Sequence, residues 1–166
     1  MEDWKKLGEF GIDTSILSRY QILCLPENIQ NQADASELID AGESITLSKL
    51  LKEEGLECAN SYDLGLDAKV SDRRGLGLWL GSIWVLNHAA LPLLINVVGR
   101  LLGERIQKKL EASKQIKASQ DDENLETTKV HANLKFVNEK INVDIEYHGD
   151  AGTFIKVLKS INGDSE

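Results

Sequence analysis

Residues 75–99 read GLGLWLGSIWVLNHAALPLLINVVG and contain no Asp, Glu, Lys or Arg, whereas the chain on either side is rich in charge. A run of this length can cross a hydrocarbon core, which takes about 20 mostly apolar residues. The fold therefore depends on whether this run is a membrane segment or is buried inside an α/β domain.

Polar residues interrupt the run at Ser82, Asn87, His88 and Asn96. A polar side chain without a hydrogen-bond partner in lipid costs free energy on the order of several kcal/mol. If the chain breaks at Asn87-His88, each half is too short to span. The arrangements left open are one kinked span, a helical hairpin in the membrane face, and a helix pair buried in a soluble or oligomeric core.

In a membrane segment, polar groups mark functional positions by default. Ser82, Asn87, His88 and Asn96 are therefore expected to line a pore or a contact between subunits. The Asn87-His88 pair can equally form a turn whose side chains satisfy freed backbone groups.

Basic and aromatic residues border the run. Arg73 and Arg74 precede it and Arg100 follows it, and we expect all of them at the membrane border or against an anionic group. Trp79 and Trp84 suit the aromatic belt at a membrane interface.

The N-terminal residues 1–72 have the order of a βαβ unit. Residues 20–25 and 56–63 are apolar, strand-like runs, and an amphipathic helix over 46–54 lies between them. Strands connected in this way are parallel and often bind ligands at their carboxyl ends. No glycine-rich phosphate loop follows the first strand, so the sequence favours a structural βαβ unit over a ligand site. The residues at those ends are Pro26, Glu27, Asn28, Tyr62 and Asp63.

The C-terminal residues 128–166 are predicted to form a ββα module, after an apolar and then basic helical segment over 73–117 and a linker over 118–127. Residues 129–137 and 141–148 alternate apolar and polar side chains, as in a β-hairpin with one wet face. The module is too small to be stable alone and must pack on the N-terminal strands, a second copy or a partner. The overall prediction is a mixed α+β fold.

The wet face of this hairpin carries His131, Asp144, Glu146 and His148. Strand alternation explains them as solvated side chains without a metal, and no metal site or cofactor is predicted. None of the familiar catalytic motifs occurs in the sequence, so we expect no enzymatic activity.

The composition limits the classes of molecule that the protein is expected to bind. The net charge of −8 argues against nucleic acid, because phosphate binding needs a basic surface. Cys24 and Cys58 lie in apolar runs and are expected to be buried, inert thiols in a reducing compartment.

The chain places an acidic α/β portion before a DRR connector at 72–74, a Trp-rich apolar run and the C-terminal segment IEYHGDAGTFIKVLKSI at 145–161. This layout resembles small accessory or effector-associated proteins of bacterial conflict systems, which act in antiviral defence. The resemblance implies a non-enzymatic partner that senses, scaffolds or perturbs a membrane, and it assigns no role to any residue.

Two functions follow. The first is a non-enzymatic, membrane-associated, oligomerising bacterial accessory or effector protein at the inner membrane. Its cytoplasmic α/β parts would sense or dock a partner, and its partners would be itself, another protein of the same system and membrane lipid. The second is a soluble, cytoplasmic, homo-oligomeric α/β binding module whose apolar helices form the subunit interface.

Overall fold

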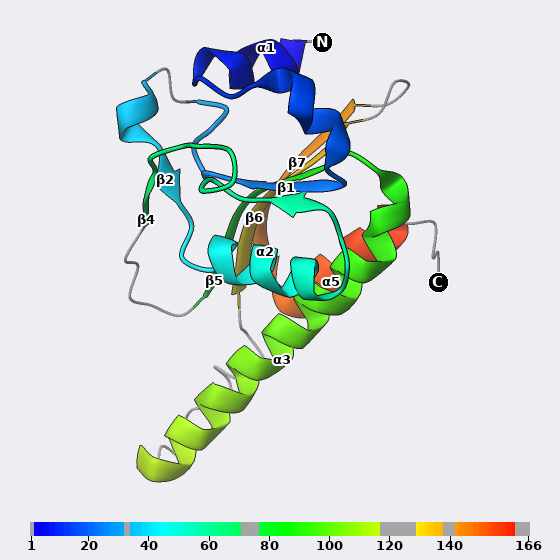
Figure 1. Cartoon of the computed structure of the whole chain (residues 1–166). Helices are drawn as coiled ribbons and strands as arrows, with labels where there is room; N and C mark the ends of the chain where they lie inside the picture. Colours follow the sequence, from blue (N-terminus) through cyan, green and yellow to red (C-terminus); the bar gives the residue numbers. More distant parts are fainter. Residues whose placement is uncertain (1, 32–33, 71–76, 117–128, 138–141, 162–166) are drawn as a thin grey trace.

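A five-stranded mixed sheet forms the centre of the protein (Figure 1). The computed structural model describes residues 2–31, 34–70, 77–116, 129–137 and 142–161. The strand order is β3-β1-β5-β6-β7, with β1 Ile22–Leu25, β3 Cys58–Ala59, β5 Leu78–Val85, β6 Lys129–Val137 and β7 Asn142–Asp150. A second, two-stranded sheet pairs β2 Ile39–Asp40 with β4 Lys69–Val70. The predicted mixed α+β class is confirmed.

Parallel and antiparallel pairings alternate along the sheet. β1 is parallel to β3 and antiparallel to β5, whereas β5 is parallel to β6 and β6 is antiparallel to β7. Strands from the N-terminal, central and C-terminal segments thus join one sheet. The helices are α1 Glu2–Glu9, α2 Ser44–Glu53, α3 Leu91–Ile116 and α5 Ala151–Ile161, with short 3₁₀ turns η1 Thr14–Arg19, η2 Ala35–Glu37 and η3 His88–Ala90.

The predicted βαβ unit is present as β1, α2 and β3, with β1 and β3 parallel. β3 is shorter than the apolar pattern over 56–63 indicates. The chain turns directly after it, where the Asp63 amide donates a 3.0 Å hydrogen bond to Asn60 Oδ1. This asparagine-centred turn competes with strand extension.

The apolar run over 75–99 is not a membrane span or a helical hairpin, and this prediction was wrong. Its first part is β5, the central strand of the sheet, and its second part begins α3 (Figure 1). β5 lacks charge because side chains on both of its faces are buried, as in strands covered on both sides. Within the described part of the chain, every helix is too short or too polar to cross a membrane.

The first turns of α3 pack on the sheet with one apolar stripe. Leu91, Leu94, Val98 and Leu101 are buried at helical spacing, whereas Asn96 is exposed. The apolar side of this part of α3 therefore belongs to the core of its own chain. The helix then extends past the sheet (Figure 1).

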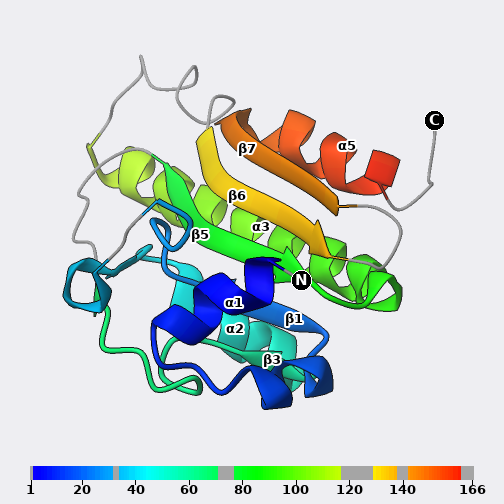
Figure 2. The ribbon, with the colours of Figure 1, turned by 90° about the horizontal axis from the view of Figure 1, so that it is seen from above.

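Two apolar cores lie on opposite faces of the sheet. One joins α2, α3 and α5 to the sheet and contains Leu47, Leu94 and Phe154, and the other joins α1 and η1 to β1 and contains Leu7, Leu17 and Trp84. Figure 2 shows β3 at one edge of the sheet and β7, followed by α5, at the other.

The C-terminal ββα module is confirmed as β6, β7 and α5. Val130, Ala132, Leu134 and Phe136 are buried under the helices, as their alternation predicts. The module gains its burial by pairing β6 with β5. The predicted linker over 118–127 lies outside the described residues.

Candidate functional site

A β-bulge in β5 decides which side chains reach the face of the sheet opposite α3. The β5–β6 register shifts between Trp79 and Gly81, so Leu80 is the extra residue and lies buried in the core under the helices. Trp79 and Ser82 consequently share the opposite face. The cross-strand rows there are Trp79–His131–His148, Ser82–Asn133–Glu146 and Trp84–Lys135–Asp144.

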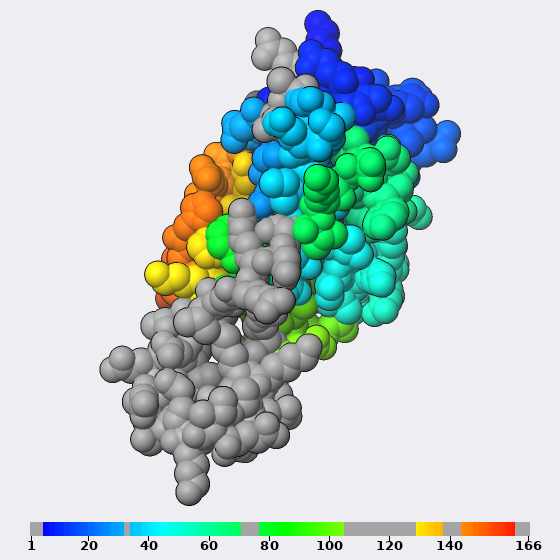
Figure 3. Space-filling view, turned by 90° about the vertical axis from the view of Figure 1, so that its left-hand side faces the viewer, coloured from blue at the N-terminus to red at the C-terminus, as the bar shows by residue number. Residues whose placement is uncertain are grey.

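A cleft of about 420 Å³ opens over these rows. Its volume lies within the range of small-molecule sites, about 300–1,000 Å³. In Figure 3 the cyan N-terminal segments lie beside the yellow and orange surface of β6 and β7. The lining comes from the segment after β1 and from β5, β6 and β7: Glu27, Gln30, Asn31, Trp79, Gly81, His131, Ala132, Asn133, Asp144, Glu146 and His148.

One row of the cleft is a chain of rings and a carboxylate. The Trp79 and His131 rings are stacked, with centroids 3.8 Å apart and planes inclined by 13°. His131 Nδ1 lies 2.6 Å from His148 Nδ1, and His148 Nε2 lies 3.1 Å from Glu146 Oε1. Two ring nitrogens can share a hydrogen bond only if one supplies the proton and the other a lone pair. At least one of the imidazoles is therefore neutral while this contact lasts.

The side chains of the Trp84–Lys135–Asp144 row bind one another or their neighbours in the sheet. Trp84 Nε1 donates a 3.0 Å hydrogen bond to Ser82 Oγ, and both residues are buried. Lys135 Nζ lies 3.7 Å from Asp144 Oδ2 and 5.2 Å from the centroid of the Trp84 ring. These contacts hold the lysine against the sheet and fix the floor beside the cleft.

Asn133 Oδ1 and Gln30 Nε2 are buried atoms without a hydrogen-bond partner among the described residues. Both side chains line the cleft. A buried polar atom that stays unpaired typically costs about 1–3 kcal/mol, and such atoms are rare in folded proteins. One of them is an acceptor and the other a donor, so together they define an unmet hydrogen-bonding requirement at this site.

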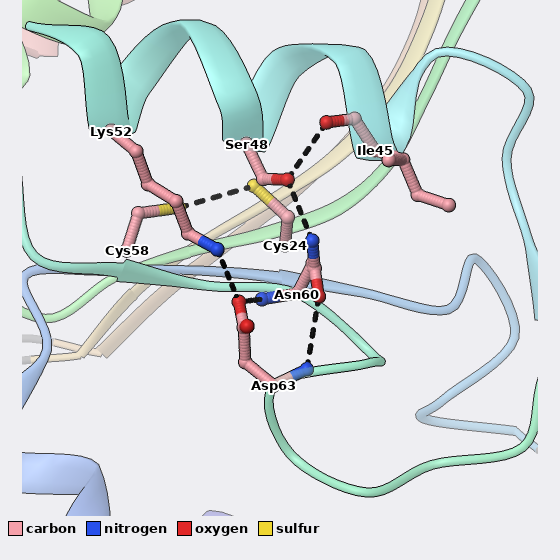
Figure 4. A network of polar contacts seen from close by, with 7 residues as sticks. All are labelled: Cys24, Ile45, Ser48, Lys52, Cys58, Asn60 and Asp63. Atoms are coloured by element: carbon pink, nitrogen blue, oxygen red, sulfur yellow. Dashed lines mark hydrogen bonds and ion pairs between the residues drawn. The ribbon is translucent and has the colours of Figure 1, made fainter.

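A different polar cluster lies at the carboxyl end of β3, and its groups are matched internally (Figure 4). Asn60 Nδ2 donates to Ser48 Oγ at 3.0 Å, and the Ser48 hydroxyl donates to the Ile45 carbonyl at 2.8 Å. Lys52 Nζ donates to Asp63 Oδ2 at 2.6 Å, and this hydrogen bond raises the pKa of Lys52. The cluster ties α2 to the turn after β3, which is a structural role.

The remaining residues expected at the strand ends do not gather at one place. Glu27 lines the cleft, whereas the Asn28 side chain bonds backbone groups of Glu37 and Ile39. Tyr62 is 79% exposed.

The cysteines face each other in the core, as Figure 4 shows. Cys24 Sγ lies 3.8 Å from Cys58 Sγ, and both thiols are free and buried. The Cys58 hydrogen bond and burial raise the pKa of the Cys24 thiol well above its usual range. Because the thiolate is the reactive form, this is the environment of an unreactive thiol.

The residues predicted in the apolar run are dispersed. Ser82 is buried in the sheet, whereas Asn96 is exposed on α3. Asn87 caps η3, where its Oδ1 accepts a 3.0 Å hydrogen bond from the Ala89 amide, and His88 is exposed in that turn. The turn interpretation thus agrees with the position of Asn87, and Ser82, Asn87 and Asn96 lie on or beside three different elements.

The residues that were expected at a membrane border lie in other environments. Arg100 Nη1 lies 3.0 Å from Oε1 of Glu54, the residue that follows α2. Arg73 and Arg74 lie outside the described residues. Trp79 lines the cleft and Trp84 belongs to the core on the same face.

Part of this site is predictable from the sequence. Strand alternation places His131, Asp144, Glu146 and His148 on one face, although it predicts solvated side chains there. Trp79, Gln30 and Glu27 reach the same cleft through the pairing of β5 with β1 and β6. The available signal was Gly81, since a glycine inside a strand pattern often marks a bulge.

Among the described residues, His, Cys, Asp and Glu side chains form no group of three or more that could hold a metal ion. No protein-family model matches the sequence, and comparison with curated proteins and with solved structures gives no significant match.

Proposed function

We propose that this protein is a non-enzymatic α/β binding module that holds a polar ligand in the cleft over β5, β6 and β7. The observation that carries the proposal is a pair of buried atoms in the wall of one cleft, Asn133 Oδ1 and Gln30 Nε2, that find no hydrogen-bond partner in the described part of the chain. A ligand with a donor and an acceptor would satisfy both atoms and recover the free energy lost when they are left unpaired.

The position of the cleft supports binding. Its floor is made of paired strands, and the stacked Trp79 and His131 rings form part of the lining. Side chains on paired strands keep their geometry better than side chains on loops, so the strand side of the site, which carries Asn133 and Glu146, is organised before a ligand arrives.

Charge supports a ligand other than nucleic acid. The lining contains the carboxylate residues Glu27, Asp144 and Glu146, which would repel phosphates. The apolar stripe of α3 is used by the core, so we assign partner recognition to the cleft rather than to this helix face. In the proposed role the occupied cleft senses a ligand or docks a partner that presents one.

A titration of the ¹⁵N-labelled protein tests the proposal. The probes are free amino acids, polyamines, nucleosides and short peptides. A ligand should shift the backbone amides of residues 131–133 and 144–148, and leave those of Ser48 and Asn60, which lie in the internally matched cluster, in place. If no probe shifts the cleft amides, the proposed function is wrong.

A further inference from the structure

We propose that the ligand is an arginine, whose guanidinium group binds beside Asn133 and Glu146 and whose own carbonyl or carboxylate oxygen accepts a hydrogen bond from Gln30. This inference rests on the binding function proposed above and assigns the chemical class of the ligand.

Charge in the cleft favours a cation. Glu27, Asp144 and Glu146 line it, and no Lys or Arg does so among the described residues. Asp144 is balanced by Lys135 at 3.7 Å, which lies beside the cleft. Since the contact between the histidine rings requires one neutral ring, it contributes at most one positive charge. The Asp144 and Glu146 carboxylates thus stand along the β7 side of the cleft, where a cationic group of a ligand would meet them.

The acceptors are spread over a width that suits a guanidinium. Asn133 and Glu146 are direct partners in the β6–β7 register, and such pairs have Cβ atoms about 4.5–5.5 Å apart. Asn133 Oδ1 is buried and needs a donor, and Glu146 offers a carboxylate next to it. A guanidinium carries five N–H donors in a rigid plane and can reach both residues, whereas an ammonium is a compact point charge.

Gln30 adds a requirement that a simple cation does not meet. Its buried Nε2 is a donor without a partner among the described residues, so the same ligand must also supply an acceptor. An arginine supplies one through its backbone carbonyl or its carboxylate. Agmatine, the decarboxylated analogue, carries the guanidinium without that oxygen and provides the matched comparison.

Isothermal titration with a matched set of probes tests this assignment. The probes are L-arginine, N-acetyl-arginine amide, agmatine, L-lysine and L-citrulline, which replaces the guanidinium by a neutral group of similar shape. We expect one of the arginine probes to bind best, with citrulline and lysine weaker by roughly tenfold or more because a charge-assisted hydrogen bond is lost. Agmatine should be weaker by several-fold. Tighter binding of the amide assigns an arginine side chain of a partner protein, and tighter binding of L-arginine assigns the free amino acid.

Glu146→Gln should weaken arginine binding by roughly tenfold while removing one negative charge. Glu104→Gln, on the exposed part of α3, changes the net charge equally and should leave the affinity unchanged. If citrulline or lysine binds the cleft as well as arginine, ligand binding stands and the guanidinium assignment is wrong. If Glu104→Gln weakens binding as much as Glu146→Gln, the effect is long-range charge and the assignment is also wrong. If neither these probes nor the wider panel shifts the cleft amides, both proposals fail.

Discussion

His131 and His148 meet through their Nδ1 atoms, 2.6 Å apart, across the β6–β7 pair. The second ring nitrogen of His148 settles which of the rings donates. His148 Nε2 lies 3.1 Å from Glu146 Oε1. A carboxylate oxygen can only accept a hydrogen bond, so the hydrogen is on His148 Nε2. In neutral His148, Nδ1 therefore carries a lone pair, and His131 Nδ1 must be the donor. The rings thus hold opposite tautomers.

This assignment predicts the nitrogen spectrum of the imidazoles. At about pH 8, where free imidazole is neutral, His131 should show a protonated Nδ1 and His148 a protonated Nε2. His88, which is exposed in η3, should show the usual mixture and serves as an internal reference. Long-range ¹H–¹⁵N correlation measures this directly. Protonated Nε2 on both His131 and His148 would contradict the hydrogen-bond chain.

Gly81 should not tolerate a side chain. Its φ of +78° is rarely adopted by other residues, and an added Cβ would lie 3.1 Å from the Leu25 carbonyl oxygen and 3.2 Å from Ala41 Cβ. We expect Gly81→Ala to lower the free energy of unfolding by about 1–3 kcal/mol, as measured in urea.

Gly99→Ala provides the control for this prediction. Gly99 lies in α3, and none of the described residues outside its own turn of helix comes within 4 Å of an added Cβ. Alanine there should raise the free energy of unfolding by about 0.5–1 kcal/mol, because glycine loses more backbone entropy in a helix. Equal effects of the substitutions would mean that the bulge places no special demand on Gly81.

The parts of the fold that could be predicted are those in which local periodicity reports burial. The alternation over β6 and β7 and the helical spacing in α2 and α5 each place one side of an element in a core. β5 gives no such signal, because a central strand with both faces buried looks like a buried helix in sequence. The length of the run then favoured a helix, although its first part is a strand and its second part a helix.

The candidate site was only partly predictable for a related reason. The histidines and carboxylates of β6 and β7 are close in sequence, and alternation alone gathers them on one face. Gln30 and Trp79 join them through β1–β5 and β5–β6 pairing, which no local pattern specifies. Trp79 and Trp84, five residues apart, share a face only because the bulge at Leu80 shifts the alternation.

Burial of Asp40 should make stability depend on pH. Burial raises the pKa of this carboxyl, and the 2.6 Å hydrogen bond from the Ser61 hydroxyl opposes that shift. An acid whose pKa is raised by folding stabilises the fold below its unfolded pKa, about 3.9, and loses that contribution as the pH rises through the folded pKa. At neutral pH the charged Asp40 is therefore a cost to the fold.

Asp40→Asn keeps an oxygen for Ser61 and removes the charge. We expect the variant to be more stable than the parent at neutral pH, and the difference to shrink as the pH falls below the usual range of aspartate. Chemical unfolding across this range measures it, with the exposed Asp67→Asn as control. A variant less stable than the parent at neutral pH would show that the fold needs the Asp40 charge.

Asn133 and Asn60 separate a binding role from a structural one. Asn60 is buried, donates to Ser48 Oγ and accepts from the Asp63 amide, so Asn60→Leu leaves those groups unpaired. We expect it to lower the free energy of unfolding by about 1–3 kcal/mol. Asn133 Oδ1 has no partner to lose among the described residues. Asn133→Leu should therefore be neutral or stabilising and should abolish binding in the cleft.

An Asn133→Leu variant that is at least as stable as the parent but no longer binds is the result expected where a binding site lowers the stability of the fold. Thermal unfolding of both variants, together with the arginine titration, measures it. If Asn133→Leu destabilises the protein as much as Asn60→Leu, Asn133 is a structural residue like Asn60. The unpartnered oxygen would then lose its force as an argument for a ligand, and the case for the cleft would rest on its charge alone.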